Sequence, residues 1–238
     1  MRALLLDLDD TLLDYSGGAD ACWEHSCAVA AEVVAPAVLV PALAETRRWF
    51  WGDAERHRRE RVDMLGAWTR IAAHALERCG CRVDGLAAAI ASDFAARRRA
   101  VMRLFPDALE CLEALRRRGV PLALVTNGDA REQRDKIARH GLAPYFGAIL
   151  IEGELGVGKP EPVVFLEALS RLGVGEPGPD VWMVGDHLEF DVAGAQRLGL
   201  RAAWVDREGL GLPAGTTVRP DRILRALVQL HDREQAGR

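Results

Sequence analysis

Short apolar runs alternate with helix-like segments along most of this chain. The runs end in polar turns and lie at residues 3–8, 120–125, 148–151, 181–184 and 202–205. Their length and continuous apolarity are typical of strands that are buried on both faces of a parallel sheet. Segments with helical character, each followed by a glycine, lie between the runs at residues 106–118, 130–140, 161–172 and 189–198. The alternation predicts a three-layer α/β fold with a parallel sheet.

The pattern changes between residues 16 and 104, where we find no strand-like run. Helical stretches dominate this segment, for example at residues 19–34, 63–78 and 84–102. The pair Gly17-Gly18 stands near its start, as at a hinge between domains. We therefore predict an all-helical domain at residues 16–104, inserted after the first strand of an α/β core that consists of residues 1–15 and 105–238.

The composition is that of a globular chain with a slight negative charge. Of its 238 residues, 49% are hydrophobic and 28% are charged, and the net charge is −4. A net acidic chain is a poor candidate for nucleic-acid binding, which depends on basic surface. The apolar stretch at residues 33–43 is broken by prolines and is shorter than the ~20 residues of a membrane span. Four apolar residues separate Arg2 from Asp7, which is fewer than a signal peptide needs. From these three observations we expect a cytoplasmic protein without nucleic-acid or membrane partners.

Lysine is scarce in this chain and therefore informative. It occurs only at positions 136 and 159, whereas lysine and arginine together number 31. A lysine kept where arginine is otherwise used suggests a site that a planar guanidinium cannot fill. Lys159 stands in the turn Gly158-Lys159-Pro160 and is our candidate for such a site. Lys136 falls in the predicted helix at residues 130–140, where we expect its charge to be solvated.

Polar side chains follow four of the predicted strands at the points where these strands end. They are Asp7 and Asp9 after the first run, Thr126 and Asn127 after the second, Lys159 after the third, and Asp186 and Asp191 after the fourth. In open α/β sheets, ligands bind just outside the carboxyl ends of the strands. We therefore expect these side chains to converge on one crevice.

A crevice with these groups suits a phosphoryl group and a divalent cation. Crowded carboxylates repel one another and are costly to bury unless a cation joins them. Ligands that are all oxygen favour Mg²⁺, and a lysine and a threonine hydroxyl beside them can hold an anion. Asp7 and Asp9 lie two residues apart, on the same side of an extended segment. If one attacks phosphorus, the other can protonate the leaving oxygen, which predicts an aspartyl-phosphate mechanism.

The ordered motifs D-x-D-x-T, T-N-G, G-K-P and G-D-x4-D closely resemble the four motifs of the haloacid dehalogenase superfamily. The resemblance runs from Asp7 to Asp191 and on through the last predicted strand. The helical insert is similar to the C1-type cap of that family. The resemblance implies a Rossmann-like core with an inserted helical cap, a bound Mg²⁺ and a small phosphorylated metabolite as substrate.

The resemblance also implies catalytic roles for three side chains. Asp7 would be the nucleophile and a metal ligand. Asp9 would act as general acid and then as general base for the hydrolytic water, with its backbone carbonyl on the metal. Lys159 would neutralise the charge of Asp7 and of the phosphoryl group.

Binding roles are implied for further residues. Thr126 would bind a phosphoryl oxygen, Asp186 would ligate Mg²⁺, and Asp191 would support the metal directly or through water. We interpret Asn127 as a second phosphoryl-binding residue, with the alternative that its amide satisfies backbone groups of the loop. His187 could touch substrate or metal-bound water, or could be an ordinary hydrogen-bonded loop residue.

Several functions remain compatible with these motifs. We expect a Mg²⁺-dependent phosphohydrolase. A phosphomutase of the same superfamily shares the core residues, and haloacid dehalogenases usually lack the second aspartate, so Asp9 favours phosphate esters. A phosphorylatable signalling receiver also uses aspartate, Mg²⁺, threonine and lysine. Receivers, however, are single small domains, and their phosphoacceptor comes from a later strand.

Overall fold

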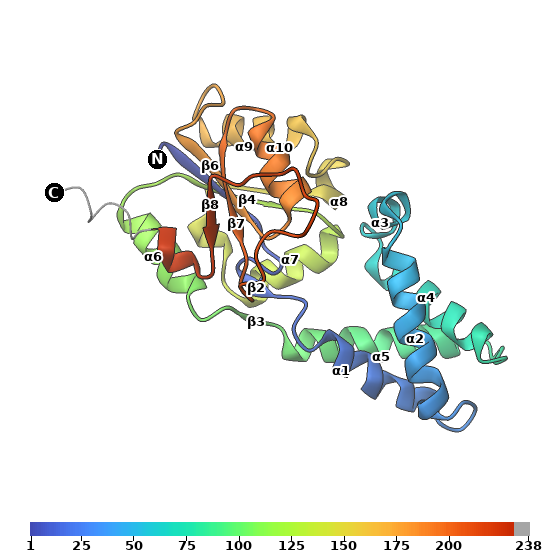
Figure 1. Cartoon of the computed structure of the whole chain (residues 1–238). Coiled ribbons are helices and arrows are strands. Elements are labelled where there is room, and N and C mark those ends of the chain that lie inside the picture. Colours follow the sequence, from blue (N-terminus) through green and yellow to red (C-terminus); the bar gives the residue numbers. More distant parts are fainter. Residues whose placement is uncertain (231–238) are drawn as a thin grey trace. The chain divides into compact units, whose positions relative to one another are not determined.

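The structure of this protein is a computed structural model that describes residues 1–230. It forms two compact units, one made of Met1–Asp14 with the chain from Arg103 onward, the other of Tyr15–Met102 (Figure 1). These boundaries lie one or two residues from the expected ones at 15/16 and 104/105. No helix among the described residues is long and apolar enough to cross a membrane.

Within residues 1–230, the first unit contains a six-stranded sheet in the order β5-β4-β1-β6-β7-β8. Its strands are β1 (Ala3–Leu6), β4 (Leu122–Thr126), β5 (Ala148–Ile151), β6 (Val181–Gly185), β7 (Arg201–Val205) and β8 (Arg222–Leu224). All neighbouring pairs are parallel, so the predicted α/β fold with a parallel sheet is confirmed. The sequence did not predict β8, because it is three residues long and its Ile223 is exposed.

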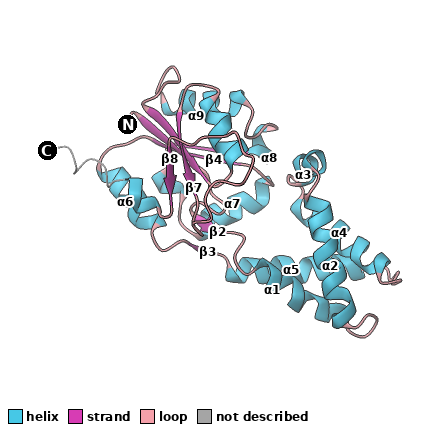
Figure 2. Cartoon of the chain, in the orientation of Figure 1, coloured by secondary structure: helices cyan, strands magenta, loops and turns pink. Residues whose placement is uncertain are grey.

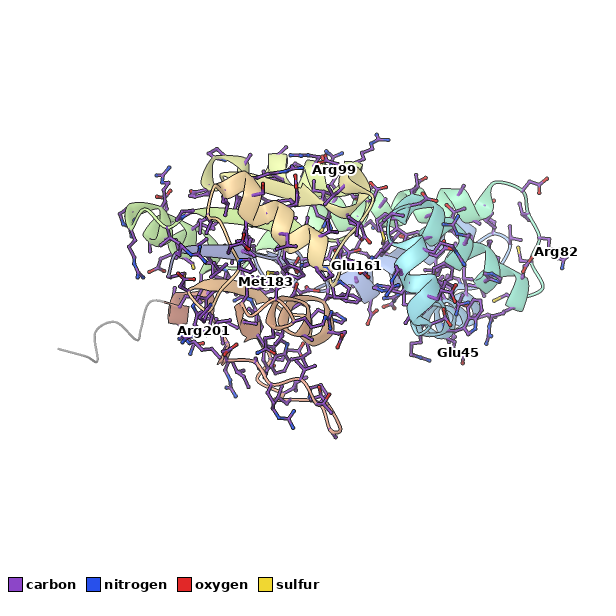
Figure 3. All side chains as sticks on the ribbon, turned by 90° about the horizontal axis from the view of Figure 1, so that it is seen from above. Glu45, Arg82, Arg99, Glu161, Met183 and Arg201 are labelled. Carbon is purple, nitrogen blue, oxygen red and sulfur yellow. The ribbon has the colours of Figure 1, made fainter. Side chains whose placement is uncertain are left out.

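Helices cover both faces of this sheet. Leu4 and Leu5 on β1 are both fully buried although they point to opposite faces. Leu5 packs in a cluster with Phe165 of α9 (Pro162–Leu172) and Met183 of β6, and Figure 3 labels Met183 within the core unit. Figure 1 shows α9 on one side of the sheet and α6 (Ala108–Arg117) and α7 (Ala130–Arg139) on the other. The layers agree with the predicted three-layer arrangement.

A short antiparallel pair stands where the chain leaves and re-enters this unit. β2 (Leu13–Asp14) pairs with β3 (Arg103–Leu104). β3 lies within the segment 16–104, for which we expected no strand. That expectation was wrong at this end, because a two-residue strand leaves no readable periodicity in the sequence.

Among the described residues, the second unit consists of helices (Figure 2). They are α1 (Ala19–Ser26), a 3₁₀ turn (Cys27–Ala30), α2 (Pro36–Trp51), α3 (Ala54–Glu60), α4 (Met64–Arg78) and α5 (Leu86–Val101). Trp23 stacks on Phe94 with ring centroids 3.8 Å apart, and both belong to a core that this unit forms by itself. We did not predict α2, since Pro36 and Pro41 interrupt its pattern; Pro36 occupies the first turn, where no backbone donor is lost.

Candidate active site

The candidate site lies at the carboxyl edge of the central strands. Asp7 directly follows β1, and its backbone N–H still donates to Val184 O of β6, at 2.9 Å. Thr126 is the last residue of β4, and Asp186 follows β6. Parallel strands whose ends share one edge bring together side chains that are far apart in the sequence.

Lys159 joins two of the carboxylates. Its Nζ donates to Asp7 Oδ1 and to Asp191 Oδ1, each at 2.6 Å, and all three residues are buried. Burial alone would lower the pKa of Lys159, but the charges of Asp191 and Asp7 outweigh it and hold that pKa above its ordinary value. The lysine therefore stays charged and offsets part of the negative charge of the site.

The carboxylates of Asp7, Asp186 and Asp191 form a cluster that could hold a metal ion, with one oxygen of each within 4.8 Å of the others. Burial, and then neighbouring charges that include Asp191, raise the pKa of Asp7 to about 7 even though Lys159 opposes the shift. Burial, followed by the charges of Asp7 and Asp191, raises the pKa of Asp186 to about 9. Such crowding disfavours the charged forms, and a divalent cation would relieve it. An all-oxygen donor set of this kind fits Mg²⁺.

The side chain of Asp9 lies outside this cluster. Lys136 Nζ donates to both of its carboxylate oxygens at 2.9 Å, and Gln133 Nε2 donates to Oδ2 at 3.0 Å. Lys136 is only 4% exposed, so our expectation that its charge is solvated was wrong. The helix α7 is mostly polar in sequence, yet it turns Gln133, Lys136 and Ile137 inward.

Sequence reasoning missed both Lys136 and Gln133 as site residues. One signal was available, since the chain contains only two lysines. Lys159 contacts Asp7 and Lys136 contacts Asp9, so each aspartate of the first motif has a lysine of its own. The scarcity of lysine marked both positions, although only Lys159 was recognised.

The structure places Thr126 and Asn127 in different environments. Thr126 Oγ1 accepts a hydrogen bond from Gln133 Nε2 at 2.6 Å. Asn127 Nδ2 donates to Lys159 O at 2.8 Å, and its Oδ1 accepts from Lys159 N at 2.7 Å. The Asn127 amide thus ties the loop after β4 to the loop that carries Lys159, which is the backbone-satisfying alternative considered from the sequence.

Glu152 is a further residue of this loop region that the sequence did not single out. It is buried at the end of β5, in α8 (Glu152–Leu155), and its Oε2 accepts from the N–H of Gly128 at 2.9 Å. A Cβ on Gly158 would lie 2.7 Å from Glu152 Cδ and would overlap Asn127 Oδ1. Glycine at 158 therefore lets the loops approach closely enough for Asn127 to bridge them.

The loop after β6 differs from the regular helix predicted at residues 189–198. It opens with a π-helical turn (Leu188–Ala193) that continues as α10 (Gly194–Gln196). His187 N donates to Asp191 Oδ2 at 2.9 Å, and His187 Nδ1 accepts from Phe190 N at 3.1 Å. The wide turn returns Asp191 to the strand end, and the His187 ring stacks on Phe190 with centroids 3.8 Å apart.

Comparisons with known proteins agree with this geometry. A family model of haloacid dehalogenase-like hydrolases matches residues 1–199. The phosphoserine phosphatase of Thermus thermophilus is 36% identical over 87% of this chain and 89% of its own length. The glyceraldehyde 3-phosphate phosphatase of Methanopyrus kandleri is 32% identical over 84% and 82%.

Solved structures extend the likeness to the whole chain. The 2-haloacid dehalogenase of Pseudomonas syringae is 33% identical with a TM-score of 0.65, covering 97% of this chain and 96% of that one. A phosphatase structure from Thermococcus onnurineus is 25% identical with a TM-score of 0.64, covering 100% and 98%. On the motifs, the fold and these matches, the chain belongs to the haloacid dehalogenase-like hydrolases.

Proposed function

We propose that this protein hydrolyses phosphomonoesters of small metabolites, with Asp7 as the nucleophile and Mg²⁺ as the bound ion. The observation that carries the proposal is the pair of aspartates in the first motif, each held by a separate buried lysine. One carboxylate can then attack while the other serves as acid and base. The two curated relatives are named as phosphatases, which supports the same reaction class.

The first chemical step transfers the phosphoryl group to the enzyme. A carboxylate oxygen of Asp7 forms a bond to phosphorus while the bond from phosphorus to the ester oxygen breaks. Asp9, in its protonated form, donates a proton to that leaving oxygen, so the alcohol departs neutral. Lys159 and the hydroxyl of Thr126 stabilise the negative charge on the phosphoryl oxygens during the transfer.

The second step releases inorganic phosphate. Asp9 is now a carboxylate and accepts a proton from a water molecule as that water attacks phosphorus. The bond between phosphorus and the Asp7 oxygen breaks, and Asp7 and the acid form of Asp9 are restored. The two steps thus exchange one proton through Asp9 and leave the enzyme unchanged.

The residues that would hold Mg²⁺ are Asp7, Asp186 and Asp191, with the backbone carbonyl of Asp9 as an expected further ligand. When bound, the ion supplies positive charge that allows several carboxylates and a phosphoryl group to share one site. Asn127 and Glu152 act on the loops and not on the substrate in this proposal, because the Asn127 amide and Oε2 of Glu152 are engaged with backbone groups.

A substrate panel tests the proposal. The purified protein with Mg²⁺ is assayed for phosphate release from an activated aryl phosphate and from phosphorylated amino acids, sugars and nucleotides. The names of the two curated relatives make phosphoserine and glyceraldehyde 3-phosphate the first compounds to include. Absence of phosphate release from every member of the panel would reject the proposal. Fractionation of the native cells would check the proposed cytoplasmic location.

A dehalogenase is the second candidate, since a 2-haloacid dehalogenase structure is 33% identical to this chain. A carbon–halogen bond breaks without protonation of the leaving group, so that reaction has no use for Asp9 as an acid. Halide release from 2-haloacids, measured beside phosphate release, decides between the two. Halide release without phosphatase activity would establish the dehalogenase.

A further inference from the structure

Lys136 occupies a position that the proposed chemistry does not explain by itself. It lies on α7, its side chain is 5% exposed, and it donates to both oxygens of a carboxylate whose own side chain is 23% exposed. Removing either partner would leave a poorly solvated charge, which is costly. The pair is therefore a firm contact, and it fixes a side chain that the reaction needs.

Gln133 extends this contact toward the phosphoryl site. Its Nε2 lies 3.0 Å from Asp9 Oδ2, 2.6 Å from Thr126 Oγ1 and 3.0 Å from Asn127 O. Thr126 accepts from Gln133 and donates its own hydroxyl proton to the carbonyl of Asn127, at 3.3 Å. One turn of α7 thus sets both the Asp9 carboxylate and the Thr126 hydroxyl.

We propose that Lys136 and Gln133 form a clamp, the Asp9 clamp, that positions the Asp9 carboxyl group so that its protonated form can donate to the leaving oxygen. Lys136 is then a positioning residue that acts through Asp9 and does not touch the substrate. The inference rests on the proposed function, because it assigns Asp9 the acid–base role. The two α7 residues thereby determine how efficiently Asp9 transfers the proton.

The consequence depends on the leaving group. Proton transfer requires donor and acceptor atoms within about 2.6–3.2 Å of each other, and a misplacement of about 1 Å can cost ~10²-fold in rate. The alkoxide of an alkyl phosphate is a poor leaving group and needs the proton. The phenolate of a strongly activated aryl phosphate leaves without it. Loss of the Asp9 clamp should therefore impair the first class and spare the second.

The test compares kcat/KM over a series of phosphomonoesters, from dinitrophenyl phosphate through phenyl phosphate to an alkyl phosphate, all with Mg²⁺. The variants are Lys136→Met, Asp9→Asn and the double variant. Arg139→Met is the control, because Arg139 is on the same helix and its ion pair with Asp135, at 3.3 Å, lies outside the site. KM and thermal unfolding are recorded for each.

We expect Lys136→Met to lower kcat/KM by ~10²-fold on the alkyl phosphate, the size of a misplaced proton donor, and by less than about fivefold on dinitrophenyl phosphate. Asp9→Asn should show the same selectivity, and the double variant should equal Asp9→Asn on every ester, because the lysine acts only through that carboxylate. Arg139→Met should follow the wild type throughout.

Three outcomes would reject either the Asp9 clamp alone or the proposed function together with it. An equal loss on all esters, or a double variant at least about tenfold worse than Asp9→Asn, rejects the Asp9 clamp while the phosphatase stands. A wild type that hydrolyses none of the esters rejects the proposed function and the inference with it. If Lys136→Met fails to fold, the double variant, which removes both charges, still decides by its comparison with Asp9→Asn.

Discussion

The ammonium of Lys136 lies 2.9 Å from each carboxylate oxygen of Asp9. The two residues are 127 positions apart in the sequence, and they meet because α7 buries its Lys136 side chain against the carboxylate of Asp9, in the loop that follows β1. Since Lys159 contacts Asp7, each of the two aspartates Asp7 and Asp9 of the first motif has a separate lysine as its partner. Two carboxylates with separate partners can hold different roles, one as nucleophile and the other as acid and base.

Replacement of Lys159 by arginine is predicted to lower kcat by at least ~10²-fold, the order expected for losing one well-placed electrostatic contact. The buried ammonium lies 2.6 Å from Asp7 and Asp191, and a planar guanidinium is too large for that space. Steady-state kinetics on a good substrate measure the effect. The matched control is Arg134→Lys, since Arg134 pairs with Glu154 at a half-exposed position. Equal kcat values for Lys159→Arg and Arg134→Lys would show that Lys159 has no part in the phosphoryl site.

Lys136→Arg is predicted to impair the enzyme, whereas the solvated charge expected from the sequence would have tolerated this substitution. The side chain is 5% exposed and bound to Asp9, so a larger cation must displace that carboxylate. We expect kcat/KM on an alkyl phosphate to fall by about tenfold or more, through misplacement of Asp9. Activity equal to that of the wild type would show that the pocket accepts arginine without moving Asp9.

The two aspartates of the first motif should fail in different ways. Asp7→Asn removes the nucleophile, so no phosphoenzyme should form. Asp9→Asn keeps the nucleophile and loses acid–base assistance, which is worth ~10²–10⁴-fold, so an activated substrate should drive accumulation of phosphoenzyme. Acid-quenched samples analysed by mass spectrometry would detect the added phosphoryl group. Near-normal turnover by Asp7→Asn would refute the aspartyl-phosphate mechanism.

Activity should vanish with a chelator and return with Mg²⁺, and the affinity for the ion should rise with pH. The pKa of Asp7 is raised to about 7 and that of Asp186 to about 9. Below these values the carboxyls carry protons that must leave before the metal binds, so affinity increases as pH rises through this window. Calorimetry in two buffers of different ionisation enthalpy would detect the released protons. Full activity in excess chelator would contradict the metal assignment.

Asn127→Ala distinguishes a loop contact from a phosphoryl contact. The substitution removes two hydrogen bonds to the backbone of Lys159, and we expect a loss of about 1–3 kcal/mol in the free energy of unfolding, with a lower kcat. Urea denaturation and kinetics on the same samples measure both. An unchanged stability with a raised KM would instead indicate that the amide binds the substrate.

Much of the fold and the outline of the site were readable in the sequence, because both have local signals. Buried parallel strands appear as short apolar runs, and β5 was found with the bounds that the structure shows. Polar residues directly after such runs must gather at one edge of the sheet, and the structure has Asp7, Thr126 and Asp186 at the ends of β1, β4 and β6. Elements too short for a period, such as β3 and β8, gave no such signal.

Tertiary packing decided the rest. Whether a polar residue on a helix faces water or a site depends on what that helix packs against, and the contacts of Lys136 are with Asp9, far away in the sequence. The same holds for Asn127, whose partner Lys159 belongs to another loop, and for the wide turn that returns Asp191 to that lysine. Sequence spacing fixes which residues share a strand end, whereas burial and pairing of charges arise only when separate segments meet.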